Sequence, residues 1–81
     1  MTDAIIDAPT WKRSARGHLW QRIGDTDAEI TVTVFRKAGS WNVYYAGSGG
    51  RKLCLNAIAR SEVGACERAM ELLLQVWAEW Y

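Results

Sequence analysis

The chain has 81 residues, of which 49% are apolar and 23% are charged, and its formal net charge is +1. This length allows one small domain with one core, and this composition excludes a chain that is disordered throughout. Its apolar runs are only a few residues long, too short to cross a bilayer. Asp3 and Asp7 stand where a signal peptide needs positive charge. We therefore expect a cytoplasmic protein whose two cysteines, Cys54 and Cys66, are reduced.

Residues 1–10 are expected to form a flexible N-terminal arm, and residues 11–81 a single domain. The sequence leaves open whether the segment 11–17 contains a strand. Beyond it, alternating apolar and polar residues predict antiparallel strands at His18–Ile23, Glu29–Lys37, Trp41–Ala46 and Arg51–Ile58. In the last of these, Leu53, Leu55 and Ala57 are predicted to share one face. Ala38–Ser40 is expected to be a short hairpin connection, and Gly47–Gly50 to turn the chain again.

After Arg60 the period of the pattern changes to that of a helix. Ser61 is placed to act as N-cap of a helix over 61–79. Apolar residues spaced by three and four form one stripe along it: Val63, Cys66, Met70, Leu73, Trp77 and Trp80. A flanking stripe widens this face: Ala65, Ala69, Leu72 and Val76.

These elements predict an α+β fold, an antiparallel three- to four-stranded meander packed on one C-terminal helix as a two-layer sandwich. The predicted core contains Val32, Val34, Val43, Leu55, Met70 and Leu73. One helix covers only one face of a sheet, so the other face meets water or a partner. That outer face is predicted to carry Thr31, Thr33, Phe35, Lys37, Asn42, Tyr44, Lys52, Cys54 and Asn56.

The small net charge conceals a division between the two predicted layers. From residue 30 to residue 60 there are five bases and no acid, whereas the helical segment 61–81 has four glutamates and only Arg68 as a base. A basic sheet attracts phosphate backbones or acidic protein surfaces. Simple solvation of a mixed-sign surface is the alternative.

No residue pattern predicts catalysis. His18 is the only histidine, and no spacing ties it to Cys54 or Cys66 as a nucleophile–base pair. One histidine and two separated cysteines do not make a closed zinc site. The glycine-rich segment 47–52 leads into a strand, whereas a phosphate-binding loop leads into a helix. We therefore expect no enzyme, no cofactor and no metal.

A basic meander followed by a helix with Ala65, Ala69 and Met70 facing it resembles two families of DNA-binding domain. These are the plant ethylene-response domain and the arm-binding domains of phage integrases, and the resemblance covers residues 29–75. Both families read DNA with a three-stranded sheet, which implies such a role for Arg36, Trp41, Arg51 and Lys52. In size and aromatic content the chain also resembles small phage-encoded accessory proteins, anti-CRISPR inhibitors among them. That likeness implies action in a bacterial host cell.

The leading expectation is a non-enzymatic binding module of the phage-accessory kind, which inhibits a host protein complex such as a CRISPR effector by occluding its surface. The alternative is a nucleic-acid-binding domain that uses its basic sheet. The predicted partner-binding residues are Trp20, Arg22, Phe35, Arg36, Trp41, Tyr44, Arg51 and Lys52. Trp77, Trp80 and Tyr81 are predicted to form a second patch, with a homodimer through the helix ends or the sheet edges. No membrane partner is expected.

Overall fold

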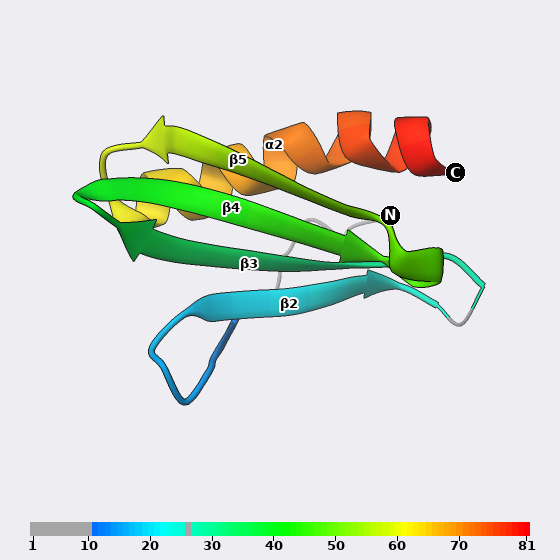
Figure 1. Ribbon diagram of the computed structural model, residues 1–81, viewed down its shortest axis with the longest axis horizontal. Helices are drawn as coiled ribbons and strands as arrows, with labels where there is room; N and C mark the ends of the chain where they lie inside the picture. The colour runs from blue at the N-terminus through cyan, green and yellow to red at the C-terminus, as the bar shows by residue number, and fades with distance from the viewer. Residues whose placement is uncertain (1–10, 26) are drawn as a thin grey trace, which may run out of the picture.

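The computed structural model describes residues 11–25 and 27–81, so the arm expected at residues 1–10 lies outside the described residues. The described chain forms one antiparallel sheet in the strand order β1-β2-β3-β4-β5, followed by the helix α2 (Figure 1). The strands are β1 (Lys12–Arg13), β2 (Leu19–Gly24), β3 (Glu29–Lys37), β4 (Ser40–Gly47) and β5 (Lys52–Ala59), and α2 is Glu62–Trp80. The predicted α+β meander is confirmed. The sheet has one strand more than predicted because β1, in the segment left open, adds a short fifth strand.

The turns form where the chain can adopt a positive φ. Between β3 and β4, Ala38 and Gly39 have φ of 54° and 80°. A two-residue turn with both φ values positive matches the right-handed twist of the flanking strands. Between β4 and β5, a single 3₁₀ turn at Ser48–Gly50 reverses the chain, and Gly49 and Gly50 there have φ of 75° and 81°.

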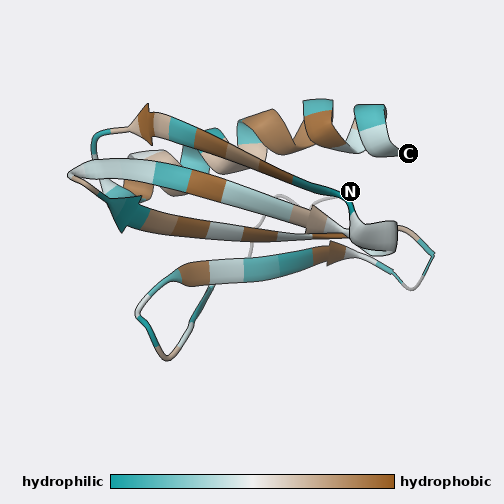
Figure 2. Cartoon of the chain, in the orientation of Figure 1, coloured by the Kyte–Doolittle hydropathy of each residue, from teal (hydrophilic) through white to brown (hydrophobic). Residues whose placement is uncertain are grey.

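The core lies between the sheet and α2. Val32, Val34 and Val43 are completely buried, and Leu73 is buried above them. Apolar segments alternate with polar ones along the strands and recur on α2 (Figure 2). Of the predicted core residues, Leu55 and Met70 are only partly buried, and both pack against the margin of this cluster.

The predicted helix is confirmed to within one residue at each end. It begins where expected, because the backbone N–H of Gly64 donates to Ser61 Oγ at 3.0 Å. Its rotation about its axis was predicted incorrectly: the fully buried side chains are Ala65 and Ala69, while Val63 is 69% exposed. Small side chains let the helix backbone approach the sheet closely enough for Tyr45 Oη to donate to the Ala69 carbonyl oxygen at 2.5 Å.

A bulge in β5 changes the orientation predicted for Ala57 and covers Asn42 on the outer face. Val43 pairs with Leu55 and Trp41 with Ala59, so one residue of β4 faces three residues of β5. Ala57, predicted to face inward, is exposed with φ of 55°. Asn42 lies on the predicted outer face, where it pairs with Phe35, but it is only 3% exposed, and its Oδ1 accepts the Ala57 N–H at 2.9 Å.

Candidate functional site

The sheet surface opposite α2, called the open face below, carries a row of side chains that crosses four strands. Trp20 pairs with Thr33, Thr33 with Tyr44, and Tyr44 with Cys54, so these four residues lie side by side from β2 to β5. Lys12 pairs with Trp20 and extends the row onto β1. Its Nζ lies 5.2 Å from the centroid of the Trp20 ring, within cation–π range.

A third aromatic side chain lies diagonally between Trp20 and Tyr44. Phe35 is two residues beyond Thr33 on β3, and its partner on β4 is Asn42. Diagonal neighbours on one face of a sheet are about 7–8 Å apart. The ring of His18 lies next to that of Phe35, and the two ring centroids are 5.7 Å apart. Aromatic rings from three strands, each of them half-buried, therefore gather on one face of the sheet.

A second cross-strand row of residues on the open face adds positive charge next to the aromatic rings. Arg22 pairs with Thr31 and Ala46 with Lys52, so Arg22 and Lys52 stand at opposite ends of one cross-strand row. Lys37, exposed at the end of β3, alternates onto the same face as Phe35. The open face thus has basic side chains on several sides of its aromatic centre.

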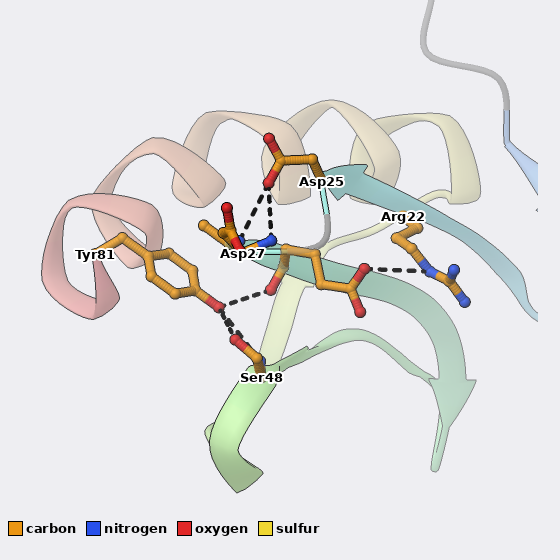
Figure 3. Close-up of polar contacts among 7 residues, drawn as sticks. Arg22, Asp25, Asp27, Ser48 and Tyr81 are labelled. Atoms are coloured by element: carbon orange, nitrogen blue, oxygen red, sulfur yellow. Dashed lines mark hydrogen bonds and ion pairs between the residues drawn. The ribbon is translucent and has the colours of Figure 1, made fainter.

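Acidic side chains are scarce on these strands. Within β1 to β5, Glu29 is the only acidic residue. Arg22 Nε lies 3.9 Å from Glu29 Oε1 (Figure 3), a long contact between two partly exposed groups. Such a surface pair contributes little free energy and leaves Arg22 available. The four glutamates of α2 lie in the other layer, which separates them from the basic side chains of the open face.

The structure divides the predicted partner-binding residues into separate groups. Five of them share the open face: Trp20, Arg22, Phe35, Tyr44 and Lys52. Arg36 pairs with Trp41 on the helix side of the sheet, where Trp41 packs against the core. Arg51 lies at the turn before β5, with its guanidinium 5.6 Å from the Tyr81 ring centroid.

Sequence reasoning missed two residues of the open face, Lys12 and His18. Both belong to the hairpin that contains β1, the segment whose conformation the sequence left open. The only sequence pattern that could have indicated this strand was the alternation of the polar Lys12 with the apolar Trp11.

The aromatic residues predicted as a second patch hold the end of α2 in place. Tyr81 Oη donates to the Glu29 carbonyl oxygen at 2.9 Å and lies 2.8 Å from Ser48 Oγ (Figure 3). The hydrogen bond with Ser48 lowers the pKa of Tyr81. The Trp77 and Tyr81 rings have centroids 4.9 Å apart. Their use as an interface stays a prediction.

Two glycines make room for the indole rings at this end. A Cβ at Gly24 would lie 2.8 Å from the Trp77 ring, and one at Gly47 would lie 2.8 Å from the Trp80 ring. The rings therefore rest directly on backbone, and both pack against the core.

Comparison with known proteins adds no assignment to this geometry. No family model, no curated protein and no solved structure matches the chain. Any function must be argued from its own surfaces.

The described residues offer two thiols, and both are free. Burial and the Glu62 carboxylate raise the pKa of Cys66, which disfavours its thiolate. Cys54 is exposed at the end of the aromatic row. In residues 11–25 and 27–81, no group of three or more His, Cys, Asp or Glu side chains is placed to hold a metal ion. Over the same residues, no helix is long and apolar enough to cross a membrane.

Proposed function

We propose that the protein is a non-enzymatic binding module whose open face binds single-stranded nucleic acid. The observation that carries the proposal is the gathering of Trp20, Phe35 and Tyr44 on one basic, solvent-facing sheet surface. Bases stack on aromatic rings at a protein surface, and basic side chains around those rings attract the phosphates that join the bases.

A single strand fits this surface better than a duplex. In a duplex the faces of the bases are stacked on one another, so flat aromatic rings have nothing to stack against except at the ends. Trp20 and Tyr44 are separated by one strand, which places them about 10 Å apart. Phe35 lies diagonally between them, so successive unstacked bases can each meet a ring. This favours the alternative expected from the sequence over the leading one.

Binding of labelled oligothymidylate, measured by fluorescence anisotropy, tests the proposal. Lys12, Arg22, Lys37 and Lys52 can neutralise about four phosphates, so the affinity should fall about 50-fold between about 50 and 200 mM salt. Tyr44→Ala should weaken binding by about 5- to 150-fold, the cost of one lost stacking contact. A duplex of the same length should bind more weakly than the single strand.

A matched pair of charge variants separates the two faces. Lys52→Gln removes a charge from the open face, and Arg68→Gln removes one from α2, where Arg68 pairs with Glu71 at 3.0 Å. The first should weaken binding and reduce its salt dependence, and the second should change neither. If no strand binds at low salt, and tagged protein instead retains a host protein complex through Trp20 and Tyr44, the proposal is wrong and the inhibitor expected from the sequence takes its place.

A further inference from the structure

The layer opposite the open face contains an apolar groove that residues 11–25 and 27–81 do not fill. Helix α2 contacts β3, β4 and β5, and Figure 1 shows it beside β5 with β2 at the far margin of the sheet. Between α2 and the hairpin β1–β2 lies a hollow of about 490 Å³, lined by Trp11, Leu19, Glu62, Val63, Cys66, Glu67 and Met70. A second hollow of about 310 Å³ follows along the helix, lined by Ile23, Gly24, Leu73, Leu74 and Trp77. The two together are called the α2–β2 groove below.

Two exposed aliphatic side chains stand on the helix edge of this groove. Val63 is 69% exposed and Leu74 is 75% exposed, and each lines one of the two hollows. They are eleven residues apart, which is close to three helical turns. They therefore project from the same side of α2, about 16 Å apart.

The apolar residues of α2 repeat with the spacing that is typical of a helix paired with a second helix. The stripe Val63, Cys66, Met70, Leu73, Trp77 and Trp80 has the alternating spacing of three and four that defines a heptad seam. The protein's own sheet buries Ala65, Ala69 and Val76 and, from the seam, Leu73, while Cys66, Met70, Trp77 and Trp80 are partly buried at the margin of the core. Five of the six seam residues nevertheless line the α2–β2 groove.

The spacing of its apolar side chains and its charge point to a second copy of the chain as the occupant of the groove. Of the four bases in residues 11–24, Lys12 and Arg22 face the open side. Arg13 lies 3.3 Å from Glu62 at the margin of the larger hollow, and Arg16 is exposed in the turn of the hairpin. A second copy offers Val63 and Leu74 at the spacing of the two hollows, on a helix whose exposed glutamates can approach Arg13 and Arg16.

We propose that two copies of the protein associate through the α2–β2 groove, with a two-fold axis running along it. The contact is isologous: the α2 edge of each copy lies in the groove of the other. Val63 and Leu74 of each copy then enter the hollows of its partner, and Glu67 and Glu71 approach the partner's basic hairpin. This contact lies along the side of the helix, and it leaves both open faces outward.

Sedimentation equilibrium from low micromolar to submillimolar concentration tests the association. We expect a mass of twice 9.1 kDa at the upper end. Leu74→Lys should weaken association at least about tenfold, because it places a charge in an apolar hollow. Gln75→Lys adds the same charge one residue further round the exposed helix surface, away from the groove, and should leave association unchanged. A monomer at every concentration, or equal effects of the two variants, would overturn the proposal.

The two thiols give a second readout that does not depend on a variant. Cys66 lines the larger hollow, whereas Cys54 is on the open face. With rising protein concentration, alkylation of Cys66 should slow several-fold while that of Cys54 keeps its rate. If Cys66 reacts at the same rate at all concentrations although a dimer forms, the dimer uses another surface and the proposed interface is wrong.

Discussion

At the scale of single residues, the fold is fixed by buried polar groups that each have one definite partner. Tyr45, Asn42 and Gln21 are buried among apolar neighbours. Each of them makes a hydrogen bond: Tyr45 to the helix backbone, Asn42 to the bulge, and Gln21 Nε2 to Met70 Sδ at 3.4 Å. Among the described residues, no buried side-chain nitrogen or oxygen lacks a partner. A change of register would leave these groups unpaired, at about 1–3 kcal/mol each, so they select one arrangement of the layers.

Asn42→Ala should destabilise the protein by about 1–3 kcal/mol, because the buried Asn42 amide no longer accepts from the Ala57 N–H or donates to the Ser40 carbonyl oxygen. Asn56→Ala is the matched control, since Asn56 is exposed on the same bulge and its amide oxygen accepts a long contact of 3.8 Å from the Cys54 thiol. Urea unfolding of both variants measures the difference. Equal losses in the two would show that the Asn42 contact does not hold the bulge.

Tyr45 should make stability depend on pH in the alkaline range. Burial raises the pKa of its phenol to about 12, against an ordinary value of 10.0. The folded protein therefore holds the proton more tightly than the unfolded chain does. This contribution is complete below pH 10 and is lost as the pH rises through about 12, with a slope of up to about 1.4 kcal/mol per pH unit.

Comparison with Tyr45→Phe isolates this effect. The variant should lose about 1 kcal/mol at neutral pH through its missing hydrogen bond to Ala69. Its stability should then fall less steeply than that of the wild type between about pH 10 and 12. Parallel pH profiles from urea unfolding of the two proteins would contradict the assignment.

At the scale of elements, the sequence predicted which segments are strands and where the helix begins and ends, because these depend on local periodicity and on the cap at Ser61. It did not predict the rotation of α2. The apolar arc of the helix is wider than its contact with the sheet, so either of two stripes could have faced the sheet. The stripe that contains Ala65 and Ala69 is the one buried, because its smaller side chains let the helix lie closer to the sheet. The bulge at Ala57 was also beyond local reasoning, since it depends on the Asn42 side chain of another strand.

Adjacent leucines on α2 test this rotation directly. Leu73 is 5% exposed and Leu74 is 75% exposed. Leu73→Ala should cost about 2–5 kcal/mol, because it opens a cavity in the core. Leu74→Ala should change the free energy of unfolding by less than about 0.5 kcal/mol when measured at low protein concentration. Thermal melts that place the two variants in the opposite order would require a different helix rotation.

The hairpin between β3 and β4 offers a stabilising change. Ala38 has φ of 54°, a conformation that costs a residue with a Cβ about 1–2 kcal/mol. Asn tolerates this region better, and Asn-Gly is the preferred pair for such a turn. Ala38→Asn should therefore raise the free energy of unfolding by about 0.5–1 kcal/mol in urea titrations. Ala15→Asn, at another exposed turn position where no positive φ is required, should give no gain.

At the scale of the whole molecule, the part of the chain that the structure describes places one helix on a five-stranded sheet and leaves two different surfaces of these elements uncovered. The open face was largely predictable, because alternation along β3 and β4 places Phe35 and Tyr44 on one side once the core side is known. The α2–β2 groove was not, because it results from the lateral position of the helix over β3 to β5, which depends on packing across the layers. The two surfaces lie on opposite layers and share no side chain.

This separation predicts that the two proposed interactions are independent for a short strand and coupled for a long one. Leu74→Lys should leave the affinity for an oligothymidylate of about ten nucleotides unchanged, because one open face suffices to bind it. A strand several times longer can reach both outward faces of the dimer, and the second contact then becomes intramolecular. The wild type should therefore bind the long strand at least about tenfold more tightly than the short one, beyond the gain expected from the larger number of sites. Leu74→Lys should lose that excess and Gln75→Lys should keep it. If both variants retain it, the two open faces do not act together, and tight binding of long strands has its origin in contacts between copies along the strand.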